Sequence, residues 1–222
     1  MAEKLYLFKG DQYIQCDVAS KTVDAGFPHR IIDDWPGLAF KDWGGGTPFS
    51  LDRNFTDANY HNGVVCFYVK NGNDLWYANY DLDNDAVSIG LVSVAYGSNV
   101  PIEFINNLSA TRYLNDDLYL FSGDSFMYRK GGTGPYFGSD ITLNTVGMTR
   151  LPAGYTSDFD SVVELEGNNT MFFKGRDCFV YPGAPQPISS VWVGTDKVGF
   201  DSDIQAAIVL PAEKSSYLGT NS

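Results

Sequence analysis

One short acidic segment has residue types that suit metal binding. Asp81-Leu82-Asp83-Asn84-Asp85 begins like a calcium-binding loop of the EF-hand type. The pattern then breaks, because Ala86 stands where that loop needs glycine and Val92 stands where it needs a bidentate glutamate. We therefore expect a polar turn between two strands at this place.

A second segment has the residue types of a hydrolase. Ser122-Gly123-Asp124-Ser125 sets a hydroxyl nucleophile beside a carboxylate, but the two histidines, His29 and His61, belong to other segments of the sequence. The chain also lacks His-x-x-x-His and Cys-x-x-Cys pairs, the usual signatures of a transition-metal site. The sequence predicts that this protein is not an enzyme.

Two glycine-rich segments place an aromatic ring beside flexible backbone. Residues 41–49 contain Trp43 and residues 131–137 contain Tyr136, and neither segment matches a phosphate-binding loop. An aromatic ring on such a loop suits a sugar or a small flat ligand. The alternative is that both segments are plain connections.

The composition and net charge limit the classes of partner that the protein could bind. The chain has 222 residues and a formal net charge of −12, which disfavours nucleic acid and favours cations. An acidic surface that only maintains solubility is the alternative. Cys16, Cys66 and Cys178 match neither a disulfide framework nor a zinc site. Residues 1–4 lead directly into an apolar segment without a signal peptide, and no apolar run could cross a membrane, so we expect a cytoplasmic or otherwise soluble protein.

The elements that would position these residues repeat along the chain. Each copy has apolar and aromatic residues before a glycine-containing turn, as in Leu5–Tyr13, Val65–Asn73, Leu118–Asp124 and Met171–Asp177. The turn glycines Gly10, Gly72, Gly123 and Gly175 are 62, 51 and 52 residues apart. A repeat of about fifty residues made of hairpins indicates a β-propeller with one blade per copy. We expect an all-β, four-bladed fold.

Each hairpin needs a further strand on its inner side. Segments with small residues precede the second, third and fourth copies at 56–60, 108–112 and 159–163, and the missing first one is found at 204–209. We therefore expect that the C-terminal strand closes the ring by completing blade 1. The predicted domain spans residues 1–222, with repeats at about 4–55, 56–106, 107–157 and 158–202 and the closing strand at 203–210.

A shared motif follows the hairpin in the first and last copies. Proline, isoleucine, tryptophan and glycine have identical spacing in Pro28–Gly37 and Pro185–Gly194. Isoleucine and tryptophan four residues apart lie on one face of a helical turn. We expect a short helix at both places.

Together these segments resemble the hemopexin repeat family. The resemblance rests on Tyr6–Tyr13, on Phe27-Pro28 through Trp35-Pro36-Gly37-Leu38, and on Asp57-Ala58. It implies a four-bladed propeller with a narrow, ion-holding tunnel. Family members often join their first and last blades by a disulfide, which no cysteine pair matches here, so strand pairing alone would close the ring.

The resemblance also implies which residues surround the tunnel. In the family, main-chain carbonyls of the four inner strands coordinate a cation on the axis. Carried over by motif position, one set of residues is Asp57, Ser109, Asp160 and Gln205, and the second is Asn59, Thr111, Val162 and Ala207. Ligands that are all oxygen suit Ca²⁺, Na⁺ or Mg²⁺. A tunnel that holds only water is the alternative.

Single-domain relatives such as plant seed albumins imply binding of polyamines or haem. We expect a non-catalytic binding protein, and the acidity favours a polyamine that enters a tunnel mouth lined by Asp57 and Asp160. Haem fits less well, because His29 and His61 are in different elements and two-domain relatives hold haem between domains. A lectin for defence or storage, with Trp43 and Tyr136 at its rim, is one alternative. A protein–protein docking module with an exposed apolar patch is another.

Overall fold

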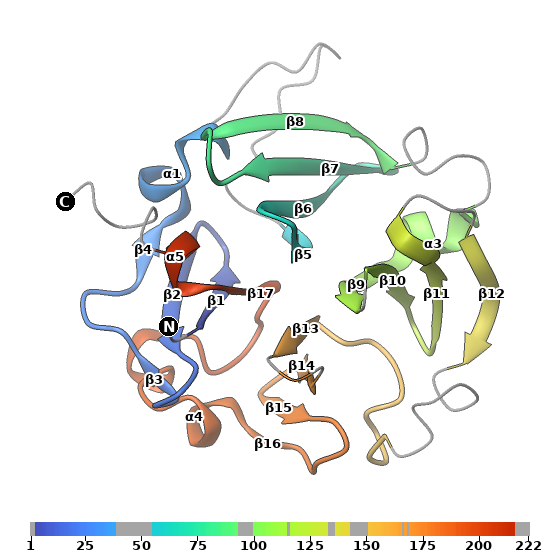
Figure 1. Ribbon diagram of the computed structural model, residues 1–222. Helices are drawn as coiled ribbons and strands as arrows, with labels where there is room; N and C mark the ends of the chain where they lie inside the picture. The colour runs from blue at the N-terminus through green and yellow to red at the C-terminus, as the bar shows by residue number, and fades with distance from the viewer. Residues whose placement is uncertain are drawn as a thin grey trace.

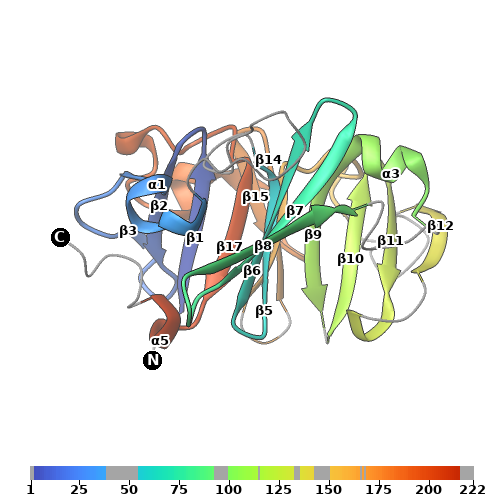
Figure 2. The same cartoon turned by 90° about the horizontal axis from the view of Figure 1, so that it is seen from above.

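The structure is a computed structural model, and it describes residues 3–38, 55–92, 100–114, 116–132, 136–142, 151–165, 167 and 169–215. Four antiparallel sheets stand around a common axis, one sheet for each predicted repeat (Figure 1). Figure 2 shows the same ring from the side. The predicted four-bladed β-propeller is confirmed.

Each blade begins with an inner strand next to the axis. The first blade contains β17 (Ala206–Leu210), β1 (Lys4–Lys9), β2 (Gln12–Asp17), β3 (Thr22–Val23) and β4 (His29–Arg30). The second contains β5 (Phe55–His61), β6 (Val64–Asn71), β7 (Asp74–Asp81) and β8 (Ala86–Leu91). The third contains β9 (Leu108–Leu114), β10 (Asp117–Ser122), β11 (Ser125–Arg129) and β12 (Tyr136–Thr142). The fourth contains β13 (Ser161–Leu165), β14 (Asn169–Lys174), β15 (Asp177–Val180) and β16 (Gln186–Pro187).

The helical segments are short and lie between strands or beyond them. They are α1 (Ile31–Asp34), η1 (Pro36–Leu38), α3 (Ile102–Asn107), η2 (Lys130–Gly132), α4 (Ile188–Val191), η4 (Asp196–Val198) and α5 (Ala212–Ser215). The predicted isoleucine–tryptophan turns are α1 and α4, in which the main-chain N–H of Trp35 or Trp192 donates to the isoleucine carbonyl four residues earlier, at 2.8 and 2.7 Å. Both tryptophans are buried against the neighbouring blades.

Glycine recurs at the same place in each repeat because the backbone conformation of the turn favours it. Gly10, Gly72, Gly123 and Gly175 occupy the hairpin turns with φ between 57° and 62°, a left-handed conformation that a side chain disfavours. The predicted hairpins are therefore present in all four blades. The segments at 81–85 and 122–125 are turns between strands of one blade, as expected.

Apolar side chains fill the spaces between neighbouring blades. Successive residues of a strand point to opposite faces, so β1 supplies two interfaces at once. Tyr6 and Phe8 pack toward the second blade, where the Phe8 and Phe67 ring centroids are 5.4 Å apart, while Leu5 and Leu7 pack toward the fourth. Two further clusters join the second blade to the third and the third to the fourth.

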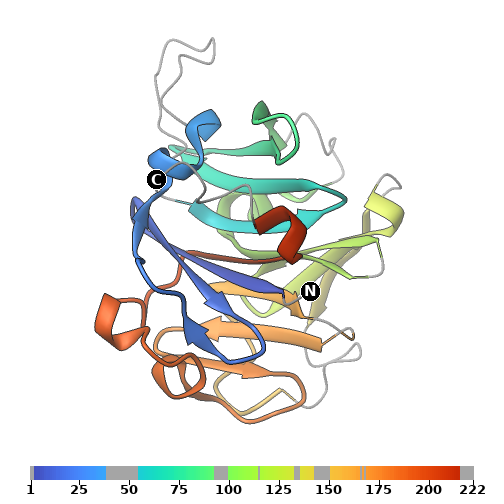
Figure 3. The same cartoon turned by 60° about the vertical axis from the view of Figure 1, so that its left-hand side comes forward.

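The first blade is built from both ends of the described chain. β17 pairs antiparallel with β1 from Lys4 opposite Leu210 to Phe8 opposite Ala206. Figure 3 shows the red strand β17 beside the blue strand β1. Cys16, Cys66 and Cys178 are all buried and none of them forms a disulfide, so strand pairing holds these described segments together.

Candidate functional site

The four inner strands surround the centre of the ring. β5, β9, β13 and β17 each contact the inner strand of the next blade, and together they surround the axis of the ring (Figure 1). Their sequences combine small and polar residues where the outer strands are rich in aromatics. This arrangement brings polar groups from four distant parts of the chain within hydrogen-bonding distance.

Asp57 on β5 is fully buried where the inner strands meet. One carboxylate oxygen accepts hydrogen bonds from the Thr111 hydroxyl on β9, at 2.8 Å, and from the main-chain N–H of Thr111. The other oxygen accepts from the Ser161 hydroxyl on β13, at 2.5 Å. The Ser161 oxygen in turn accepts the N–H of Ala207 on β17, at 3.0 Å. We call Asp57, Thr111, Ser161 and Ala207 the axial network.

The axial network differs from the grouping of residues that motif position predicts. Motif position set Asp57 beside Ser109 and Asp160, but its carboxylate bonds Thr111 and Ser161. The register of the inner strands is irregular at this end, with a shift in β5 between Phe55 and Asp57 and another in β9 between Leu108 and Ala110.

Asp57 also differs from a typical cation ligand. Burial raises its pKa well above the usual value, and hydrogen bonds from Ser161, Thr111 and the main chain of Ala58 oppose that shift only in part. Both oxygens already accept hydrogen bonds, which leaves little capacity for a metal ion. No group of three or more His, Cys, Asp or Glu side chains within the described residues is arranged to hold a metal ion.

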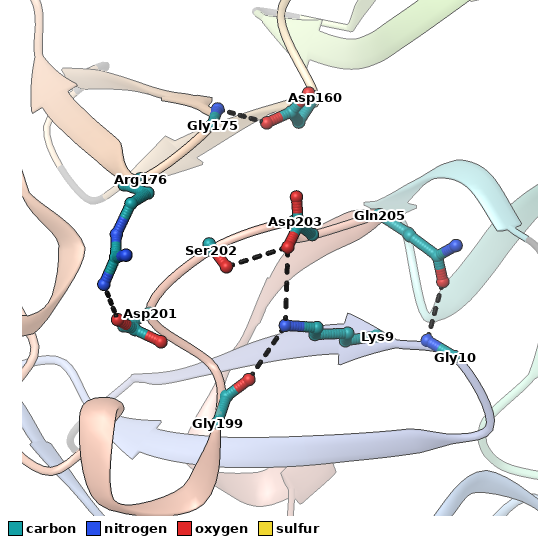
Figure 4. Close-up of polar contacts among 10 residues, drawn as sticks. All are labelled: Lys9, Gly10, Asp160, Gly175, Arg176, Gly199, Asp201, Ser202, Asp203 and Gln205. Carbon is teal, nitrogen blue, oxygen red and sulfur yellow. Dashed lines mark hydrogen bonds and ion pairs between the residues drawn. The ribbon is translucent and has the colours of Figure 1, made fainter.

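The other members of the first predicted set serve their own blades. The main-chain N–H groups of Gly175 and Gly10 donate to the side chains of Asp160 and Gln205, at 2.5 and 2.7 Å (Figure 4). Ser109 donates to the Phe121 carbonyl at 3.3 Å. These side chains therefore connect the start of an inner strand to the nearby hairpin.

These three residues nevertheless lie together at one end of the inner strands, where they line one cavity. A cavity of about 410 Å³ opens there, and we call it the acidic mouth because Asp158, Asp160 and Asp203 line it. Burial, with a contribution from Asp203, raises the pKa of Asp160. The Lys9 ammonium lies 3.7 Å from Asp203 and donates to the Gly199 carbonyl, beside the cavity rather than in its lining (Figure 4).

The second predicted set is only partly brought together. The Asn59 amide donates to the Thr111 hydroxyl at 2.9 Å, and Ala207 takes part through its main chain. Val162 is buried in the apolar cluster between the third and fourth blades. Asn59, Val162 and Ala207 also line a second cavity, of about 300 Å³, at the opposite end of the inner strands.

Sequence reasoning missed Ser161 and Arg112, which follow Asp160 and Thr111 directly. The signal for Arg112 was available, because a long cation is unusual in a strand of small residues. Of the predicted rim aromatics, Trp43 lies outside the described residues, and Tyr136 begins β12 opposite Arg129.

Comparison with known proteins gives the arrangement a name. Residues 2–39 match the Hemopexin family model. The hemopexin fold protein CP4 from cow pea is 17% identical, with a TM-score of 0.57 over 70% of this chain and 77% of that one. This chain has the hemopexin fold.

Two Cicer arietinum proteins share the hemopexin fold over more of the chain. A plant albumin showing hemagglutination is 18% identical, with a TM-score of 0.68 over 88% of this chain and 92% of that one. A plant lectin with two metal binding sites is 15% identical, with a TM-score of 0.64 over the same shares. The curated proteins contain no match to this chain. Within its described residues, this hemopexin-fold chain has no helix able to cross a membrane.

Proposed function

We propose that this hemopexin-fold protein is a non-catalytic binding protein whose acidic mouth holds a small polycation such as a polyamine. The observation that carries the proposal is the lining of that cavity. Three carboxylates line it, and none of its described lining residues is a lysine or an arginine. We expected Asp57 to bind the ligand together with Asp160, but its carboxylate lies inside the axial network. We therefore propose that Asp158 and Asp203 bind the ligand beside Asp160.

The electrostatics of the acidic mouth favour this ligand. Burial disfavours the ionised form of Asp160, and a bound ammonium group would compensate that carboxylate directly. The net charge of −12 adds a long-range attraction for cations. A flexible chain of amines can meet several carboxylates at once without needing a rigid pocket.

Calorimetric titration of the EDTA-treated protein with spermine tests the proposal. We expect binding that weakens as salt is added, and at least a tenfold loss of affinity when Asp160 and Asp203 are both changed to asparagine. The matched control is Asp33→Asn with Asp196→Asn, which removes the same charge from two exposed positions. Equal affinity in the two double variants would refute a local site.

A tunnel cation, Ca²⁺ or alternatively Na⁺ or Mg²⁺, remains part of the proposal. Support comes from the plant lectin with two metal binding sites, which has the same fold. Because Asp57 already accepts three hydrogen bonds, we assign the cation to main-chain carbonyls near the acidic mouth. Terbium luminescence, with displacement by Ca²⁺, measures this binding without reference to spermine.

Carbohydrate binding with a defence or storage role is the second candidate. It is favoured by the Cicer arietinum albumin showing hemagglutination, which has a similar fold. We propose that the loops around Trp43 and Tyr136 contact the sugar. Erythrocyte agglutination that is lost in Trp43→Ala or Tyr136→Ala, and retained in Asp160→Asn, would support a rim site.

The hypothesis of a protein–protein docking module has less support than the polyamine and carbohydrate hypotheses. The large hydrophobic side chains exposed in the described part of the chain are Ile102 and Val193. They belong to α3 and to the segment after α4, on different sides of the ring in Figure 1. They do not form the contiguous patch that this hypothesis predicts.

A further inference from the structure

The end of the inner strands opposite the acidic mouth contains a buried cation. Arg112 is 2% exposed and lines the cavity of about 300 Å³. Its guanidinium donates to the Thr170 hydroxyl on β14 and lies 5.5 Å from the ring centroid of Tyr119. Its Nε has no hydrogen-bond partner. We call this cavity the Arg112 mouth.

A buried acceptor lines the same cavity. Asn59 is 5% exposed, and its amide nitrogen donates to the Thr111 hydroxyl at 2.9 Å. Its amide oxygen has no hydrogen-bond partner. Buried polar atoms are nearly always paired in folded proteins, since an unpaired one costs about 1–3 kcal/mol. The side chains that carry these two atoms line one cavity, and a small shift of each side chain would let a ligand in the cavity supply the opposite of each atom.

The charges limit what this ligand can be. Glu164 on β13 attracts Arg112, but these two described residues form no direct ion pair. Burial raises the pKa of Glu164, and Glu3 brings a second carboxylate to the lining. An anionic ligand would meet two carboxylates, and a cationic ligand would meet the buried guanidinium. A neutral ligand avoids both penalties.

Hydroxyl groups satisfy these requirements, because each can donate and accept. A hydroxyl oxygen can accept from Arg112, while hydroxyl protons are donated to Asn59 and Glu164. The remaining lining includes Leu165 and Val209, which suit the C–H surface of a sugar ring. The volume is at the lower end of the range for small-molecule sites.

We propose that the Arg112 mouth binds a neutral polyhydroxylated molecule of monosaccharide size. Arg112 is the donor, Asn59 and Glu164 are the acceptors, and the apolar side chains contact the ring carbons. The site is separate from the acidic mouth and from the rim loops. The proposal does not rest on polyamine binding, and it gives the carbohydrate hypothesis a location among the described residues.

Calorimetry of the full chain tests the proposal with glucose, galactose, mannose and myo-inositol as probes. We expect at least one to bind with one site per chain. The charged relatives glucosamine and glucuronate should bind at least fivefold more weakly than the matching neutral sugar. Heat from none of the four neutral probes, or tighter binding of a charged relative, would overturn the proposal.

Two variants locate the site. Glu164→Gln removes one acceptor charge, and Leu165→Trp fills the cavity while leaving the axial network intact. Each should lower the affinity for the best neutral probe at least tenfold, whereas Asp160→Asn at the acidic mouth should leave it unchanged. If Glu164→Gln unfolds the protein, the affinity of the Leu165→Trp variant alone tests the location of the site. Unchanged affinity in a folded Leu165→Trp variant overturns the assignment.

Discussion

The Asp57 carboxylate of the second blade accepts a hydrogen bond of 2.5 Å from the Ser161 hydroxyl of the fourth blade, across the centre of the ring. Thr111 of the third blade bonds the same carboxylate, and Ala207 of the first bonds Ser161. One acidic side chain therefore connects all four blades where water is excluded. Asp57, which the motif position suggests as a ligand-binding residue, thus has a structural role in this network.

Replacing Asp57 by alanine should destabilise the protein by about 3 kcal/mol or more, because the hydroxyl and N–H groups that it bonds would be left buried without partners. Urea unfolding measures the loss. Ser109→Ala is the matched control, since it removes a single partly exposed hydrogen bond of 3.3 Å and should cost about 1 kcal/mol or less. Equal losses for the two variants would contradict the assigned role of Asp57.

The raised pKa of Asp57 predicts a pH dependence of stability. The folded state keeps the Asp57 proton at pH values where the unfolded chain, with a pKa near 3.8, has released it. Unfolding therefore becomes relatively easier as pH rises above that value. The free energy of unfolding of the wild type should fall with pH relative to Asp57→Asn, which has no proton to release at this position. Parallel pH profiles would contradict this result.

The thiols should be unreactive in the folded protein. Burial raises the pKa of Cys16 and of Cys178 to about 12, and the thiolate is the reactive form. Ellman's reagent at pH 8 should label neither residue in the native state and all three cysteines in urea. Rapid native labelling of Cys16 or Cys178, identified by mass spectrometry, would show that these strands open readily.

We expect the fold to need the closing strand β17, but not the side-chain hydrogen bond that Gln205 makes just before that strand. Gln205→Ala removes one hydrogen bond to Gly10 and should cost about 0.5–1.5 kcal/mol. Deletion of residues 204–222 removes β17 and should abolish cooperative unfolding, because Leu5, Leu7 and their partners lose the strand that covers them. Cooperative thermal unfolding of the shortened chain would show that the other three blades suffice.

The fold was predictable because its main signals are local. Each turn glycine marks a hairpin, and its positive φ explains why glycine recurs there. The isoleucine–tryptophan spacing likewise predicts α1 and α4. The closing strand could be found because the first copy lacks a segment that the other three have.

The site was less predictable because register shifts in the inner strands have no clear sequence signal. Both β5 and β9 depart from regular pairing near their starts. Motif alignment therefore did not show that the Asp57 carboxylate bonds Thr111 and Ser161. Asp160 lines the acidic mouth, but no motif specifies its hydrogen bond to Gly175, which lies fifteen residues further along the chain.

The pairing of β17 with β1 also sets the order of events during synthesis. The ribosome makes Gly10 long before Gln205, and 195 residues separate these two bonded partners. The first blade must therefore wait, without its inner strand, until nearly all of the described chain has been made. Contacts so distant in sequence slow folding, and an unpaired β1 edge is exposed in the meantime. A nascent chain of this protein is thus vulnerable to aggregation until β17 has been made.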